Sequence, residues 1–518
     1  MAGRTQPVNT GPGTGAAILV AVLILGALLA VALRAQGRVS LDTQDWAALR
    51  FTVLQAVLSA VLSVGLAVPV ARALARRSFP GRGGLVTLLG APFLLPVIVA
   101  ILGLLAVFGR SGWVNDLLAV FGLAPVQIYG LHGVVLAHVF FNLPLATRLI
   151  LQGWQSIPAE RFRLAAQLGC GAGDVLRLLE LPMLARVIPA TLAVVFAICL
   201  TSFAVALTLG GGPRATTLEL AIYQAFRFDF DLTRAAALSC LQIVLAGSAV
   251  LVALRWAPPE GFGAGMDRAR LRWDSQGRWL RAQDGGVIFL AGMFLLVPLM
   301  AIVFAGAPGL VSLPNSVWRA ALVSLGVAAF SCAVLMALAV PMAIAIAAGR
   351  HKWVDLAGLL GLTASPLVIG TGLFIVINPV TDPFALALPV TGLVNAVMAL
   401  PFALRILVPG MRDVVSDHGR LGQSLGMAGW PFLWLVVLPR IRPQIGFAAG
   451  LGAALSMGDL GVIALFADPE RATLPLQVYR LMGAYRMEAA AGASLLLLIL
   501  TLGLFWVLDR GGRLNADP

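Results

Sequence analysis

The chain is poor in charged residues, histidine and cysteine. Only 11% of its 518 residues are charged, four are His and four are Cys. The cysteines form no Cys-x-x-Cys pair and have no histidine partner nearby, and three of the four lie in or beside apolar runs. Cysteine in such runs acts as a small hydrophobic residue. We therefore expect neither a disulfide nor a metal site.

Lysine is almost absent, because arginine supplies all but one of the 36 basic residues. A phosphate-binding P-loop needs Gly-Lys-Ser/Thr. The one lysine, Lys352, is followed by Trp353, so the chain has no such motif. Nucleotide hydrolysis by a P-loop would belong to another chain. We expect no catalytic residues and no cofactor bound by this one.

Apolar sequence is abundant instead. The chain is 60% hydrophobic with a mean hydropathy of +0.95, which is unlike a soluble protein. Apolar runs of about twenty residues recur, each enough to cross a hydrocarbon core about 30 Å thick. We predict an all-α polytopic membrane protein with about twelve helices. The predicted spans are residues 16–34, 51–71, 84–108, 131–151, 184–208, 235–254, 286–306, 317–348, 353–377, 388–408, 441–466 and 489–508.

One polar stretch occurs twice, 257 residues apart. RLAAQLGCGAGDVLRLLELP runs from Arg163 to Pro182, and RLGQSLGMAGWPFLWLVVLP runs from Arg420 to Pro439. The match continues upstream without a gap, where FNLPLATRLILQG overlies MALPFALRILVPG. Coincident Gly and Pro over nearly forty residues indicate an internal duplication.

The duplication fixes the domain organisation. We predict a first half at 1–254, a linker at 255–285 and a second half at 286–518, with six helices in each half. The repeat covers spans two to six of each half, so the first span of each half looks added on. An even number of spans returns the chain to its starting side, so the two halves form a parallel repeat.

The arginines set the predicted orientation. Basic residues are more frequent on the side that carries the repeated loops, which places these loops and both termini in the cytoplasm. The clusters are Arg72, Arg76, Arg77 and Arg82; Arg268, Arg270, Arg272, Arg278 and Arg281; and Arg350 with Lys352. The first span could also be read as a signal peptide. Because it is long and lacks a clear cleavage site, we predict a retained anchor.

The repeated loops (residues 160–182 and 417–439) have the pattern of a helix, a break and a second short helix. Gly169 and Gly426 can end the first helix with a positive φ. Asp174 can cap the next turn in the first copy, where Pro431 starts it in the second. Pro182 and Pro439 precede the following span. A single such loop would be a simple connection, but two on one side favour a paired docking surface.

The spacing from the glycine to the Leu-Pro pair resembles the EAA loop of binding-protein-dependent ABC transporter permeases. This resemblance implies a type I importer permease fold, in which each loop docks on a cytoplasmic ATPase. Gly169, Leu179, Leu181 and Pro182 match the motif in the first copy. The second copy matches at Gly426, Val436, Leu438 and Pro439. The family's Glu is replaced in both copies, by Arg163 and Arg420, and Gly422 replaces an Ala, so the contact chemistry differs.

The full duplication resembles the fused permeases of iron(III) and thiamine uptake. Residues 458–466 (GDLGVIALF), 473–475 (TLP) and Tyr485-Arg486 resemble the thiamine group more closely. The resemblance implies an importer permease in the bacterial inner membrane that moves thiamine or its phosphate esters, with iron(III) as the alternative. The implied partners are a separate ATPase homodimer that binds ATP and Mg²⁺ and a periplasmic or extracellular substrate-binding protein.

Four polar residues are candidates for the substrate pathway. Asp459 lies late in a span, where a carboxylate could meet a cationic thiazolium; it could equally bond to a helix end. Ser202 is its repeat partner, and Asn142 and Asn395 are explained at least as well by helix–helix hydrogen bonds. A secondary transporter would need more paired acids or histidines than Asp459 supplies. No cluster suits an intramembrane enzyme.

Overall fold

The computed structural model describes residues 10–35, 41–90, 92, 94–212, 215–256, 277–349, 352–427, 429–466 and 471–513, and every regular element in these ranges is helical. The first half contains α1 (Gly11–Arg34), α2 (Thr43–Arg76), α3 (Arg82–Leu88), α4 (Val97–Phe108), α5 (Trp113–Val120), α6 (Leu131–Ser156), α7 (Ala159–Gln167), α8 (Ala172–Val175), α9 (Leu181–Leu200), α10 (Ala204–Leu209), α11 (Leu218–Arg227) and α12 (Leu232–Trp256). The second half contains α13 (Arg278–Val311), α14 (Asn315–Ala347), α15 (Lys352–Leu359), α16 (Pro366–Ile377), α17 (Ala387–Ser424), α18 (Trp430–Phe432), α19 (Leu438–Arg440), α20 (Arg442–Gly458), α21 (Gly461–Phe466), α22 (Leu474–Gly483) and α23 (Met487–Arg513).

Eleven helices in the described ranges are long and apolar enough to cross a membrane, or up to twelve when a bent pair counts as one span. The bent pair, Lys352–Leu362 and Pro366–Ile377, turns by 97°. The all-α polytopic prediction is therefore confirmed. Most of the predicted linker, residues 257–276, lies outside the described residues.

Four of the predicted spans are not continuous helices. Span 84–108 is split into α3 and α4, and span 353–377 is split into α15 and α16. Spans 184–208 and 441–466 end early, at Leu200 and Gly458, and short helices α10 and α21 follow each break. Hydropathy cannot reveal these breaks, because the residues on both sides of each break are equally apolar.

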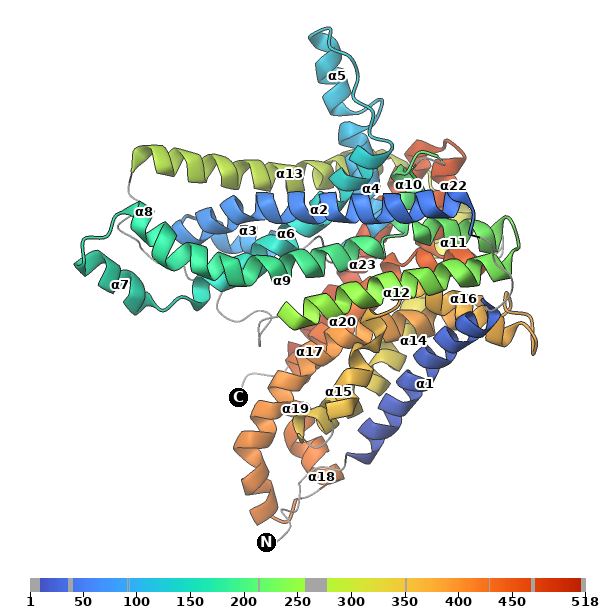
Figure 1. Cartoon of the computed structure of the whole chain (residues 1–518). Helices are drawn as coiled ribbons and strands as arrows, with labels where there is room; N and C mark the ends of the chain where they lie inside the picture. Colours follow the sequence, from blue (N-terminus) through green and yellow to red (C-terminus); the bar gives the residue numbers. More distant parts are fainter. Residues whose placement is uncertain are drawn as a thin grey trace.

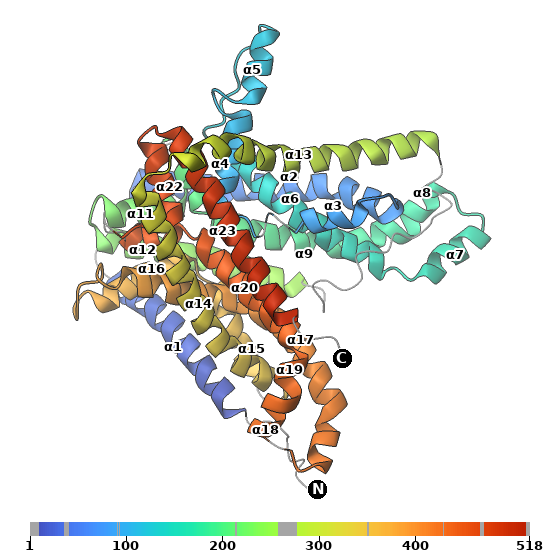
Figure 2. The ribbon, with the colours of Figure 1, turned by 180° about the vertical axis from the view of Figure 1, so that it is seen from behind.

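Two groups of helices, each of which includes the first helix of the other half, diverge from a shared end (Figures 1 and 2). Helices α2, α6, α9 and α13 run side by side toward α7 and α8, whereas α1, α14, α15 and α17 run toward α18. Helices α4, α10, α11, α16 and α22 gather where the two groups meet, and α5 protrudes beside them. The two repeated loops thus lie at the far tips of the molecule.

The first helix of each half packs on the other half. Helix α1 contacts α14 and α16, and α13 contacts α2 and α4 in the matching arrangement. Both contacts bring two backbones close together. A Cβ added at Gly103 would lie 2.5 Å from the Pro298 carbonyl oxygen, and one at Gly372 would lie 2.3 Å from that of Ala27. Small residues allow such close helix packing in membrane proteins.

A second matched contact anchors α11 and α22. The Thr52 hydroxyl oxygen accepts a hydrogen bond from the Leu218 N–H at 2.8 Å, and the Ser324 hydroxyl oxygen accepts one from the Leu474 N–H at 2.7 Å. Each hydroxyl satisfies an N–H group in the first turn of a buried helix, which has no acceptor within its own helix. The duplication is therefore visible at the level of single hydrogen bonds.

Candidate functional site

The repeated loops 160–182 and 417–439, named the coupling loops after the family motif that they resemble, share one backbone path. In each, the first helix ends at a glycine with φ +68°, Gly169 or Gly426. A Cβ at either glycine would meet no atom within 4 Å. The need for glycine is therefore conformational, since an L-residue with left-handed φ costs about 1–2 kcal/mol.

A π-helical turn follows the glycine at the same repeat offset. It spans Leu176–Glu180 in the first loop and Leu433–Val437 in the second. π-Helical turns are rare and often mark functional sites. Pro182 and Pro439 then lie in the first turn of the next helix, where a missing N–H is harmless. The Asp174 carboxylate accepts from the Gly171 N–H at 2.9 Å, as the sequence predicted for a cap.

The two loops are connected to the preceding membrane helix in different ways. Pro158 precedes α7, and Ile157 before it is extended, so α6 and α7 are separate helices. A residue before proline disfavours helical geometry. Val415 occupies the matching position in the second half, and α17 runs unbroken through the loop to Ser424. One coupling helix is thus hinged to its membrane helix, and the other is its direct extension.

The coupling loops present exposed surface. Arg163, Gly169, Leu181 and Pro182 are exposed in the first loop. In the second loop Arg420 and Gly426 are exposed, whereas Leu438 and Pro439 are half-buried. Two repeat-matched leucine pairs are also exposed, Leu164 with Leu421 and Leu168 with Leu425. Matched apolar side chains without cover are typical of an interaction surface.

A buried ion pair holds the first coupling loop against α2. The Glu180 carboxylate is fully buried and lies 2.8 Å from the Arg72 guanidinium and 3.6 Å from that of Arg76. Val437 stands at the matching position in the second loop and is buried without a charge. The two loops are therefore braced by different chemistry.

Four helix breaks converge at the end where the halves meet. They lie between α3 and α4, α9 and α10, α15 and α16, and α20 and α21. A Cβ added at Gly458, before the last break, would lie 3.1 Å from Pro96 Cα at the start of α4. One at Gly461 would lie 3.5 Å from Leu367 Cδ1 at the start of α16. A broken helix leaves backbone N–H and C=O groups unpaired, and inside a membrane these groups need protein or a polar cavity around them. In transporters such groups bind substrates and ions.

Asp459 lies in one of these breaks. Its Oδ1 accepts a hydrogen bond from the Gly461 N–H at 3.1 Å, so the carboxylate bonds to the start of α21. Its Oδ2 is buried and has no hydrogen-bond partner. One oxygen thus serves the fold, as the helix-end alternative predicted, and the other is buried without a hydrogen bond.

The remaining pathway candidates lie near the breaks. Ser202 is half-buried between α9 and α10. Buried Asn142 donates to Cys199 Sγ at 3.3 Å, and buried Asn395 donates to Ser456 Oγ at 3.1 Å. Both asparagines form helix–helix hydrogen bonds, the alternative that the sequence left open.

Sequence reasoning missed the buried carboxylate of Glu219. It is fully buried in α11, and its Oε1 accepts from Gln242 Nε2 at 3.0 Å. Burial raises the pKa of Glu219 to about 8, and hydrogen bonds from Ser365 and Gln242 oppose that shift. The sequence did hold a signal, because Glu219 is an isolated acid in TLELAIYQAF and Pro475 stands at the matching position.

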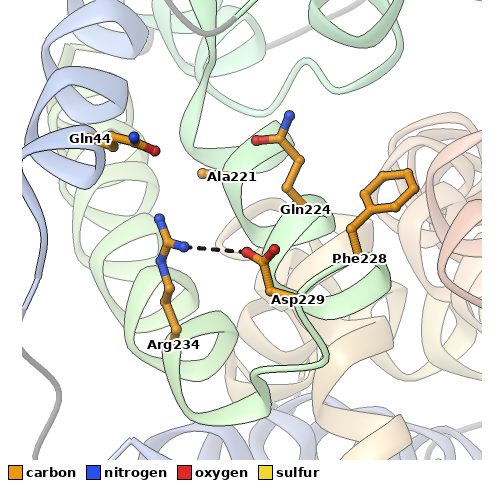
Figure 3. Close-up of a pocket in the computed structure, with 6 residues that line it drawn as sticks. All are labelled: Gln44, Ala221, Gln224, Phe228, Asp229 and Arg234. Carbon is orange, nitrogen blue, oxygen red and sulfur yellow. Dashed lines mark hydrogen bonds and ion pairs between the residues drawn. The ribbon is translucent and has the colours of Figure 1, made fainter.

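A polar cavity of about 290 Å³ lies beside Gln44 at the start of α2 (Figure 3). It is lined by Gln44, Ala221, Gln224, Phe228, Asp229 and Arg234. Arg234 lies 2.7 Å from Asp45 and 3.3 Å from Asp229, so its charge is already compensated. Within the described ranges, no group of three His, Cys, Asp or Glu side chains is arranged to hold a metal ion.

Comparison with known proteins gives close relatives over the whole length, although no protein-family model matches the chain. The chain is 41% identical to the thiamine transport system permease protein ThiP of Brucella abortus (strain 2308), over 99% of this chain and 96% of that protein. It is 39% identical to the protein of the same name from Escherichia coli (strain K12), over 100% of both. The Haemophilus influenzae protein of that name is 35% identical over 83% of this chain.

Proposed function

The chain belongs to the family of thiamine transport system permease proteins, and we propose that it imports thiamine or its phosphate esters as the membrane permease of an ATP-driven importer. The observation that carries this proposal is the 39–41% identity over nearly the full chain to relatives of that name. The duplicated coupling loops support it independently. The relatives' names favour thiamine over the iron(III) alternative.

The proposed partners act at opposite ends of the molecule. A cytoplasmic ATPase homodimer binds ATP and Mg²⁺ and docks on the two coupling loops, because a two-fold partner needs two equivalent surfaces on one side. Arg163 and Arg420 are exposed on these loops, so the surface they offer is basic where the family pattern is acidic. A substrate-binding protein delivers the substrate at the end where the helix breaks converge.

The transport step follows from the separation of the loops. Each loop lies at the tip of one diverging group of helices (Figure 1). When ATP binding closes the ATPase dimer, the loops approach each other and the opposite end opens to receive substrate. ATP hydrolysis then restores the arrangement described here. The substrate passes Asp459, Ser202, Asn142 and Asn395 on this route, while the chain itself performs no chemistry.

The proposed location is the bacterial inner membrane, with both termini in the cytoplasm. The arginine-rich ends support this orientation. Arg72, Arg76 and Arg77 lie at the end of α2 that packs near the first coupling loop.

Uptake into proteoliposomes tests the proposal. Proteoliposomes that contain the purified chain and its ATPase, supplied with the binding protein outside, should accumulate radiolabelled thiamine. Accumulation should require ATP on the side of the membrane that carries the ATPase. Unlabelled thiamine should compete, and iron(III) should not. Accumulation of radiolabelled iron(III) without any thiamine signal would overturn the choice of substrate.

A further inference from the structure

Glu219 is a buried carboxylate for which the packing of α11 gives no reason. It has no exposed surface, and its Oε2 has no hydrogen-bond partner. Burying a carboxylate without full pairing is costly. Pro475 holds the matching position in α22, so the repeat builds the same short helix without an acid. An acid at this position is therefore not needed to form the short helix.

The surroundings of Glu219 join the two halves. Gln242 Nε2 donates both to Glu219 Oε1 at 3.0 Å and to the Leu200 carbonyl oxygen at 2.9 Å, at the break after α9. From the other half, Ser365 hydrogen-bonds to Glu219. The Ser365 Oγ also accepts from the Val368 N–H at 3.2 Å and so caps α16. Glu219 thus reaches from a break in the first half to a helix start in the second.

Asp459 lies on the other side of that helix start. Gly461, whose N–H bonds to Asp459, is adjacent to Pro366 and Leu367. Each carboxylate keeps one buried oxygen without a hydrogen-bond partner, Glu219 Oε2 and Asp459 Oδ2. Glu219 has Gln242 and Ser365 as partners, and Asp459 has the Asn395 side chain and backbone N–H groups of residues 461–463. None of these partners is an arginine or lysine. Two unpaired acids, one from each half, therefore flank residues 365–367.

This arrangement suits a cation with a fixed charge. A helix start carries partial positive charge and would repel a cation unless acids offset it. A quaternary ring nitrogen has no proton to donate, so it needs a counter-charge rather than a directed hydrogen bond. Open carboxylate oxygens near broken helices provide such a counter-charge.

We propose that Glu219 acts together with Asp459 as a specificity-determining carboxylate for a substrate with a quaternary ring nitrogen, and that Ser365 covers it while the two halves are joined. When that end of the molecule opens, Ser365 moves away with α16, water reaches Glu219, and the side chain loses its proton and faces the incoming cation as a carboxylate. This proposal rests on the proposed import of thiamine and names the second charged group that selects it.

The test compares a cation with its neutral isostere. Uptake of radiolabelled thiamine is measured beside that of its thiophene analogue, in which carbon replaces the quaternary nitrogen. The uptake rate of each variant is divided by the wild-type rate for the same ligand. This ratio cancels any preference of the binding protein for one of the two ligands. E219Q should lower kcat/KM for thiamine about tenfold or more, as expected when a cation loses a nearby counter-charge, and that of the analogue much less.

Two further variants make the result decisive. E180Q removes a buried carboxylate outside the route and should lower both uptake rates by the same factor. E219Q/Q242E exchanges the two hydrogen-bonded side chains, so the pair still contains one carboxylate and one amide. This variant should restore part of the preference for thiamine. Equal losses for both ligands in E219Q, with no restoration in the swap, would overturn the inference. If the wild type imports neither ligand, the proposed function itself fails.

Discussion

The ring of Phe432 fills the space that a side chain at position 422 would need. A Cβ added at Gly422 would lie 2.7 Å from Phe432 Cδ2, and Phe432 is fully buried. The first coupling loop holds Ala165 and Val175 at the matching positions. The two copies thus have opposite distributions of volume at these positions, and the Phe432 ring explains why the family's alanine is a glycine here.

The contact predicts a rescue. G422A should destabilise the protein by about 1–3 kcal/mol, because an extra methyl in a filled core forces the neighbours to move. G422A/F432V reproduces the pair of the first loop and should recover most of that loss. Thermal unfolding of the detergent-solubilised protein measures both. If F432V worsens G422A instead of relieving it, the paired packing is wrong.

The hydroxyl anchors of α11 and α22 give a second prediction. S324A leaves the Leu474 N–H buried without its acceptor, which should cost about 1–3 kcal/mol of stability. T52V should act in the same way at Leu218. S416A is the control, since the Ser416 hydroxyl is exposed on α17 and bonds only locally. Equal melting temperatures for S324A and S416A would show that the anchor contributes nothing.

The ion pair at Glu180 gives a third prediction. E180Q leaves the buried Arg76 guanidinium without its counter-charge, and breaking such a pair costs about 3–5 kcal/mol. D509N removes a carboxylate from the partly exposed pair with Arg513 and should change stability little. Denaturation curves compare the two variants. A loss in E180Q no larger than that in D509N would contradict a bracing role.

The fourth prediction concerns pH. Burial raises the pKa of Glu219 from 4.5 to about 8, and its hydrogen-bond partners Gln242 and Ser365 are uncharged. The folded protein therefore binds this proton more tightly than the unfolded chain. The stabilisation is fully present below pH 4.5 and is lost as pH rises toward about 8. E219Q should flatten the dependence of melting temperature on pH across this window. An unchanged slope would mean that Glu219 does not titrate there.

The sequence predicted features that depend on local pattern. Apolar runs gave the spans, and the repeat placed Gly169 and Gly426 at helix ends, where both have φ +68°. It predicted no helix where α11 and α22 lie. These helices are short, so a search for membrane-length runs misses them.

Contacts between distant segments were beyond the sequence. The exchange of α1 and α13 between the halves depends on close approaches such as Gly103 to Pro298, and no single-chain pattern encodes them. Glu219 could be recognised as an isolated acid in the sequence. Its partner Ser365, 146 positions away in the other half, could not be predicted from it. Local chemistry can be read from a sequence, whereas pairings across the fold need the structure.

In the proposed function, ATP-driven transport depends on the two coupling loops. The direct measurement is ATP-dependent thiamine uptake by proteoliposomes carrying G169R/G426R, beside the wild type and G122R. Gly122 has φ +66° and equally open space, but it lies in the loop after α5. We expect uptake in the wild type and G122R and none in the double variant, with all three folded. Uptake that persists in the double variant, or that runs on a proton gradient without the ATPase, would contradict the account.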